Sequence, residues 1–184
     1  MVNTNAITLA TIFTGIVLAL GYASFGFWTM IIFTSGFLGG FFLWLLFRSH
    51  APFSAIKWPY ILSFVLFALH RVEEKQFDFF RELSTITGIS TPDIFSPQVV
   101  LLVIASVGAW LLVPYLIKRK YEFGYHLAWT FFAAMGITEL AHFVLPIFVD
   151  EAYGYFPGMA SVLLLAPVAW WGMYRLATSS SSTK

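Results

Sequence analysis

The chain has 184 residues, of which 59% are hydrophobic and only 10% are charged, and its net charge is +1. Soluble domains carry about 25% charged residues, so this composition indicates a protein of the lipid bilayer, and the absence of a basic stripe excludes a nucleic-acid partner. Zero cysteines exclude disulfides, thiolate metal sites, iron–sulfur clusters and a cysteine nucleophile.

Residues 6–47 form an uncharged run that is long enough for two passes, because a bilayer core needs about 20 apolar residues per helix. Gly21, Ser24 and Gly26 favour a turn within residues 21–27. If this run were a single helix, the number of helices would be odd and the N-terminus would lie on the other side of the membrane. The apolar runs together predict an all-α, polytopic membrane helix bundle of about six transmembrane helices. These helices cover residues 6–22, 27–47, 58–80, 98–117, 122–148 and 156–176.

Residues 1–177 form a single predicted integral membrane domain, followed by a polar, disordered tail over 178–184. The third helix begins near Trp58, which places Pro59 in its first turn, where a missing N–H is harmless. Beyond the bilayer this helix extends to about Phe80. The polar residues 81–97 then form the one loop of substantial length.

Two further patterns describe how the predicted helices bend and pack. Pro114 and Pro167 predict kinks in the fourth and sixth helices. Gly36, Gly39 and Gly40 form a patch of small residues on the second helix, which favours close contact with another helix. Both features are typical of membrane architecture and carry no chemistry.

Lysine and arginine residues concentrate in the loops at one end of the predicted bundle. Cytoplasmic loops of membrane proteins carry an excess of these residues. The charges therefore predict that both termini are cytoplasmic, and we expect the bilayer to be a bacterial inner membrane. The basic residues on the predicted cytoplasmic side are Arg48, Lys57, Lys118, Arg119, Lys120, Arg175 and Lys184.

Ionisable side chains interrupt two of the predicted helices. His70, Glu73 and Glu74 lie in the third helix, and Glu139 and His142 lie in the fifth. Such groups are costly in hydrocarbon and mark functional sites, and residues three or four apart share one face of a helix. The third and fifth helices run in the same direction, which places both clusters in the outer half of the membrane. We therefore expect the two clusters to share one cavity.

A Glu/His pair one turn apart on each of two helices is how helical bundles hold iron or manganese. Imidazole and carboxylate without thiolate suit Fe, Mn or Zn. The pattern predicts a metal-dependent enzyme that acts on a lipid or another apolar small-molecule substrate. Its predicted metal ligands are His70, Glu73, Glu74, Glu139 and His142, and Glu73, Glu74 and Glu139 are the predicted catalytic carboxylates.

Structural interpretations of the same residues stay open. The segment from His70 to Asp78 also fits a solvated helix end, in which charges such as Arg71 and Glu74 pair at the surface. Glu139 has apolar neighbours on both sides, so its structural alternative is a protonated carboxyl that donates a hydrogen bond to a neighbouring helix.

Three functional alternatives remain beside the metal enzyme. The first is a metal-free acid/base enzyme, such as a lipid or terpenoid isomerase or cyclase, in which a buried Glu is the acid and a His its partner. The second is a haem protein that binds haem b with His70 and His142 as axial ligands. The third is a non-catalytic membrane protein that conducts ions or protons or binds lipid.

The segment His70-Arg71-Val72-Glu73-Glu74 resembles the signature of the HXXEE-motif integral membrane proteins, a family without an assigned activity. The resemblance implies a membrane fold and a site at His70, Glu73 and Glu74, and it implies nothing about Glu139 or His142. A fainter similarity links the chain to the sterol isomerase and sigma-2 receptor group. Those are small helical membrane proteins with acid/base His and Glu groups in a lipid cavity.

Overall fold

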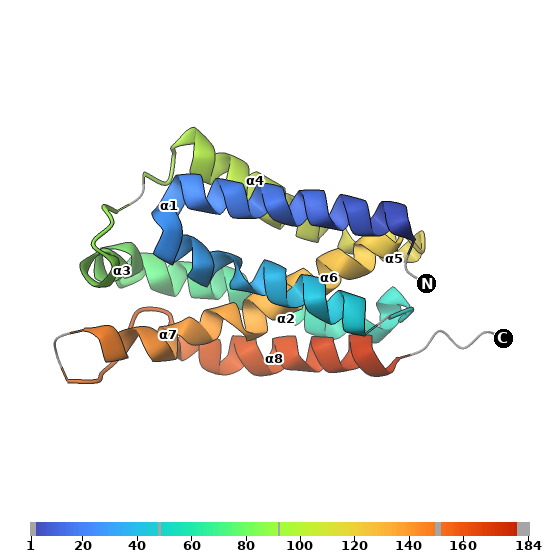
Figure 1. Cartoon of the computed structure of the whole chain (residues 1–184). Helices are drawn as coiled ribbons and strands as arrows, with labels where there is room; N and C mark the ends of the chain where they lie inside the picture. Colours follow the sequence, from blue (N-terminus) through green and yellow to red (C-terminus); the bar gives the residue numbers. More distant parts are fainter. Residues whose placement is uncertain (1–2, 48, 92, 150–151, 180–184) are drawn as a thin grey trace.

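The computed structural model describes residues 3–47, 49–91, 93–149 and 152–179, and every regular element in these ranges is helical. The predicted all-α bundle is confirmed (Figure 1). Its elements are α1 (Thr4–Leu46), α2 (Phe53–Gln76), α3 (Phe79–Thr87), α4 (Pro97–Leu111), α5 (Val113–Lys118), α6 (Glu122–Gly136), the 3-10 turn η1 (Thr138–Leu140), α7 (Ala141–Val144), the 3-10 turn η2 (Leu145–Phe148) and α8 (Met159–Thr178).

α1 folds back on itself and crosses the bundle twice, as Figure 1 shows. Gly26 breaks the helix with φ 70° and ψ −179°, a conformation that is essentially restricted to glycine. The rings of Phe13 and Phe37 lie 6.1 Å apart, whereas 24 residues of straight helix would span about 36 Å. The predicted break within residues 21–27 is therefore confirmed.

Five helical stretches are long and apolar enough to cross a membrane: α1, α2, residues 97–118, residues 122–148 and α8. Because α1 folds back at Gly26, these five stretches make six passes, in agreement with the prediction. The outer surface of the bundle is apolar, and side chains such as Ile12, Leu163 and Leu164 are more than half exposed. The chain is thus built as a membrane protein.

α6 forms the centre of the bundle, and every residue from Gly124 to Gly136 is buried. A helix that is apolar on all sides requires neighbours on all sides. Gly36 and Gly40 let α1 contact the backbone of α6, since a Cβ at either position would lie 2.4 Å from the Cα of Ala134 or Thr130. The predicted small-residue contact is confirmed at these two positions, whereas a Cβ at Gly39 would make only an ordinary contact, 4.0 Å from Ile137 Cδ1.

The third predicted helix has different ends from those expected. α2 begins at Phe53, so Pro59 lies inside the helix and not in its first turn. α2 ends at Gln76, because Asp78 adopts a left-handed conformation with φ 54°. The extension to Phe80 is therefore wrong.

The predicted loop over residues 81–97 is wrong in its first part. α3 occupies Phe79–Thr87 and turns its apolar face, Phe79 and Leu83, into a small core with Leu145 and Phe156. A four-residue apolar spacing is sufficient to bury one face of a short helix.

The fourth helix breaks at Leu112, before Pro114, which confirms the predicted kink. α8 runs unbroken through Pro167 and ends at Thr178. The tail predicted over 178–184 therefore starts within this helix, and residues 180–184 lie outside the described residues.

The fifth predicted helix is not continuous. α6 ends at Gly136, and Ile137 has φ −121° and ψ −54°. The carbonyl of Gly136 accepts a hydrogen bond of 2.7 Å from Trp170 Nε1 of α8, and the Leu140 N–H bonds to Ile137 instead. The side chain of Trp170 thus replaces the helical partner, and the chain continues as short 3-10 and α turns.

Both described ends of the chain lie at the same end of the bundle (Figure 1). Lys120 lies beside Asn3 and Asn5 there, and Lys57 and Lys118 line a common pocket nearby. Arg48 and Lys184, which contributed to the predicted orientation, are outside the described residues.

Candidate metal centre

Four buried side chains from two membrane-spanning segments meet in the structure. α2 contributes His70 and Glu74, which lie one turn apart on the same face. Glu139 comes from η1 and His142 from α7. Each of these four residues is 6% exposed or less. The expectation that the two clusters meet is confirmed for these four residues.

Each imidazole of this group faces both carboxylates. His70 Nε2 lies 3.4 Å from Glu74 Oε1 and 3.2 Å from Glu139 Oε2. His142 Nε2 lies 3.4 Å from Glu74 Oε1 and 3.3 Å from Glu139 Oε2. One potential ligand atom from each residue lies within 4.8 Å of the other three. We call these four residues the His/Glu centre.

Hydrogen bonds to Nδ1 determine which nitrogen of each imidazole faces the carboxylates. His142 Nδ1 lies 2.5 Å from the carbonyl of Pro157 and must donate, because a carbonyl only accepts. His70 Nδ1 lies 2.8 Å from Ser161 Oγ, whose own hydroxyl donates to the carbonyl of Gly158. Ser161 therefore accepts from His70. In both neutral imidazoles, Nε2 carries a lone pair that points into the centre.

The centre consequently requires positive charge. With neutral imidazoles, two nitrogen lone pairs face two carboxylate oxygens, and all four groups repel one another. Glu74 Oε1 is buried and, within the described structure, has no hydrogen-bond partner. An unsatisfied buried acceptor is costly. Either a bound cation or protons on both Nε2 atoms would satisfy these groups.

Arg71 binds the outer oxygens of both carboxylates. Its Nη1 lies 2.7 Å from Glu74 Oε2, and its Nη2 lies 2.9 Å from Glu139 Oε1. The guanidinium also lies over the ring of Phe67, 5.0 Å from its centroid. Arg71 thus orients the inner oxygens of Glu74 and Glu139 toward the imidazoles. The sequence predicted its pairing with Glu74 but not its contact with Glu139.

Glu73, which was also predicted as a ligand, lies outside the His/Glu centre. Its Oε1 accepts hydrogen bonds from the Tyr155 hydroxyl at 2.5 Å and from the Ala160 N–H at 3.0 Å. Its Oε2 accepts from the Ser161 N–H at 2.8 Å. These two N–H groups belong to the first turn of α8 and have no partner within the helix. Glu73 therefore caps α8 and connects it to α2.

Tyr155 lies in the loop before α8 and stays protonated as the donor of this contact. Burial, its hydrogen bond to Glu73 and the negative charge of that carboxylate raise its pKa to about 12. The phenol therefore donates to Glu73 throughout the physiological pH range.

Gly158 allows the start of α8 to lie against both imidazoles. Its φ is 98°, and a Cβ here would lie 2.5 Å from His142 Cε1 and 2.8 Å from His70 Cε1. Only a residue without a side chain fits in this conformation and in this space. The only sequence signal for this contact was the Pro157-Gly158 pair, which is typical of a turn.

An apolar cavity of about 350 Å³ ends beside the His/Glu centre. Arg71 and Glu139 form its polar end. The other walls come from α1, α2, α4 and α6, and they include Phe25, Phe33, Phe37, Phe67, Leu102, Trp110 and Met135. Cavities of this size hold small ligands. Glu139 is therefore the member of the centre that a molecule in the cavity would meet.

The solvated-helix interpretation of residues 70–78 is wrong for the site itself, because His70 is fully buried and Glu74 is 4% exposed.

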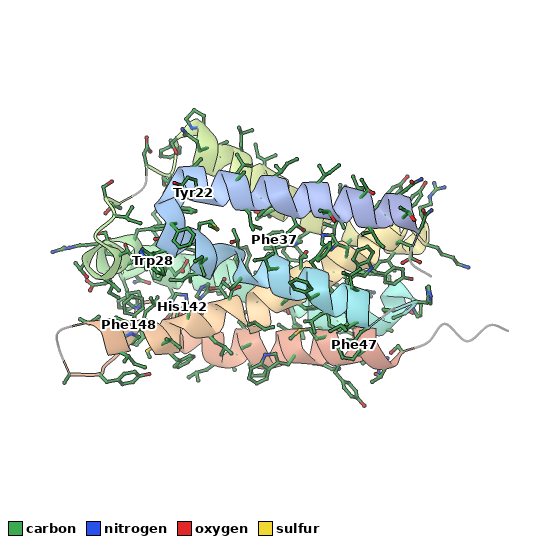
Figure 2. The ribbon with its side chains drawn as sticks, viewed as in Figure 1. Tyr22, Trp28, Phe37, Phe47, His142 and Phe148 are labelled. Atoms are coloured by element: carbon green, nitrogen blue, oxygen red, sulfur yellow. The ribbon has the colours of Figure 1, made fainter. Side chains whose placement is uncertain are left out.

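Figure 2 shows His142 toward the end of the bundle that carries Phe148 and Trp28, away from Phe47. The centre therefore lies in the half of the bundle opposite the chain ends, as the sequence predicted.

No protein-family model, curated protein or solved structure matches this chain. The resemblance of residues 70–74 to the HXXEE motif stays a prediction.

Proposed function

We propose that this protein is a membrane metalloenzyme in which His70, Glu74, Glu139 and His142 hold one divalent transition-metal ion. The observation that carries the proposal is the pair of Nε2 lone pairs facing two carboxylate oxygens at 3.2 to 3.4 Å. Ligand atoms of a tetrahedral site with bonds of about 2.0–2.2 Å lie roughly 3.3–3.6 Å from one another, so these four separations are compatible with one metal ion between the residues.

The donor set favours iron, manganese or zinc, since imidazole and carboxylate are the common ligands of these metals. Two carboxylates offset the charge of a divalent ion, which lowers the cost of holding it in a buried site, and Arg71 brings the net charge of the loaded group to +1. A haem is less compatible with this geometry, because oxygens of Glu74 and Glu139 occupy the space that both Nε2 atoms face.

We infer an apolar or lipid substrate from the cavity that ends at Arg71 and Glu139. A metal at this centre would polarise a substrate oxygen or activate a bound water. The aromatic and aliphatic walls would hold the apolar part of the substrate, and Arg71 would remain paired with the two carboxylates. Of the three predicted catalytic carboxylates, Glu139 is the one that lines this cavity.

Metal analysis of the purified protein tests this proposal. After expression with added Fe, Mn and Zn, we expect about one equivalent of one metal in the wild type. Glu74→Gln and His142→Gln should each lose most of it, because each removes a ligand. Glu73→Gln is the matched control: it changes the adjacent carboxylate of the same helix, which is outside the His/Glu centre, and should keep the metal.

Metal bound equally by Glu73→Gln and Glu74→Gln, or absent from the wild type, would contradict the proposal. The second result would favour the metal-free acid/base enzyme. That alternative has its own support, since protonated Nε2 atoms of His70 and His142 would both donate to Glu139 Oε2 at 3.2 and 3.3 Å. Enzymatic activity that survives strong chelators would then distinguish the metal-free acid/base enzyme from the metalloenzyme.

A further inference from the structure

A basic pocket lies at the opposite end of the bundle from the His/Glu centre. It has a volume of about 600 Å³ and is located between the start of α2 and the loop after α5. Lys57, Lys118 and Lys120 line it together with His50. Lys57 precedes Glu74 by 17 residues of α2, which corresponds to about 25 Å along the helix. The pocket is therefore separate from the proposed metal site.

The three lysines of this basic pocket have no acidic partners. Within the ranges that the structure describes, none of them forms a salt bridge with an Asp or Glu side chain. Glu122, the nearest acid in sequence, lies with Lys120 at a neighbouring hollow and does not line this pocket. Three positive charges around one pocket without acidic counter-charges would attract an anion.

Part of the pocket wall is apolar, and the adjoining residues of α2 belong to the lipid-facing surface. Phe53, Ile117 and Tyr125 form part of the lining. Trp58, which directly follows Lys57 in α2, is 60% exposed, and Leu62, one turn further, is 42% exposed. An exposed Trp at the end of a span is typical of the membrane–water interface. A ligand with an anionic head at the lysines could thus place acyl chains against the outside of α2.

We propose that this pocket binds the phosphate-bearing headgroup of an anionic phospholipid. Basic pockets between membrane helices are suited to such headgroups, because the phosphate lies at the depth of the helix ends. Lys57 contributes from α2, and Lys118 and Lys120 contribute from the α5 end, so a bound lipid would also connect two separate spans. The chemistry recognised is a phosphate monoanion with attached apolar chains.

Native mass spectrometry of the detergent-purified protein, with equal amounts of phosphatidylglycerol and phosphatidylcholine added, tests the proposal. We expect the wild type to retain phosphatidylglycerol preferentially. The variant Lys57→Gln/Lys118→Gln/Lys120→Asn should lose this preference, with about a fivefold loss of affinity for each lysine removed. Lys120 has a φ of 59°. Asn replaces it because Asn tolerates this left-handed conformation.

The matched control is Lys75→Gln/Arg81→Gln/Arg119→Gln, which removes the same charge from residues outside the pocket. It should keep the wild-type preference, and equal loss in both variants would overturn the proposal. The single lysine variants provide a second measurement if the triple variant does not fold, and each should show an intermediate loss. A third arm uses inorganic phosphate: binding at low millimolar concentration, with no gain from lipid, would identify a soluble phosphate and overturn the lipid assignment.

Discussion

Ser161 and the carbonyl of Pro157 hold the two imidazoles of the His/Glu centre by their Nδ1 atoms. Partners of this kind keep the Nε2 lone pair of a metal-binding histidine directed at the metal. Ser161 lies in the first turn of α8 and Pro157 in the turn before it, and α8 itself supplies no member of the centre. The first turn of α8 and the turn before it therefore orient ligands that belong to other segments.

Ser161→Ala should weaken metal binding by about 10- to 100-fold, the usual effect of removing such a partner. The physical reason is that His70 then loses the acceptor of its Nδ1–H and can turn or change tautomer. Competition with a chelator of known affinity measures the change. Ser84→Ala removes a hydroxyl that donates to the carbonyl of Arg81 within its own helix and serves as the control. Unchanged affinity in Ser161→Ala would show that Nε2 is oriented without this serine.

Glu73→Gln should lower the melting temperature although it leaves the metal in place. Glu73 accepts three hydrogen bonds, two of them from the first turn of α8, and bonds to a charged acceptor are worth about 1.5–3 kcal/mol each. An amide retains one acceptor oxygen, so we expect a loss of about 1–3 kcal/mol. Thermal unfolding followed by tryptophan fluorescence measures it. A variant that loses metal but not stability would assign Glu73 to the centre.

The fold-back of α1 depends on one backbone conformation. Gly26 has φ 70° and ψ −179°, and a Cβ there would lie 3.0 Å from Ile89 Cδ1. Gly26→Ala should therefore cost about 1–3 kcal/mol and lower the melting temperature. Gly15→Ala is the control in the same helix, because a Cβ at Gly15 meets no atom within 4 Å. Gly15→Ala should be neutral or slightly stabilising, and equal effects of both substitutions would contradict this role of Gly26.

The interruption of the fifth span places Glu139 and His142. In a continuous helix, these residues would follow the register of α6, which is packed on all sides by α1, α5 and α8. Trp170 donates a hydrogen bond to the carbonyl of Gly136, and the chain continues as η1 and α7 in a different helical register. A contact from α8 thus determines the position of two members of the centre.

The arrangement of the bundle predicts that Asn5 and Thr178 lie on one side of the membrane and Ala152 on the other. We propose that the first side is the cytoplasm of a bacterium, because the basic residues lie there. The chain has no cysteine, so single substitutions to cysteine at these positions give no background. An impermeant maleimide added to intact cells should label Ala152→Cys only. Labelling of Asn5→Cys and Thr178→Cys but not Ala152→Cys would reverse the orientation, and labelling of just one chain end would refute an even number of passes.

The amino-acid sequence by itself determined the membrane class, the six passes, the turn near Gly26 and the residues of the centre. Each of these follows from local physics: apolar length against bilayer thickness, the conformational freedom of glycine, and the cost of ionisable groups in hydrocarbon. The same local information predicted Glu73 as a ligand, since Glu73 and Glu74 are equivalent in spacing from His70.

Only the tertiary structure decided between these two carboxylates. The first turn of α8 offers free N–H groups to Glu73, whereas Arg71 and the two imidazoles face Glu74. The roles of Ser161, Pro157 and Gly158, the break caused by Trp170 and the cavity also arise from contacts between distant segments. Such contacts depend on which helix faces pack against each other. That is set by the packing of the entire chain, and local periodicity does not specify it.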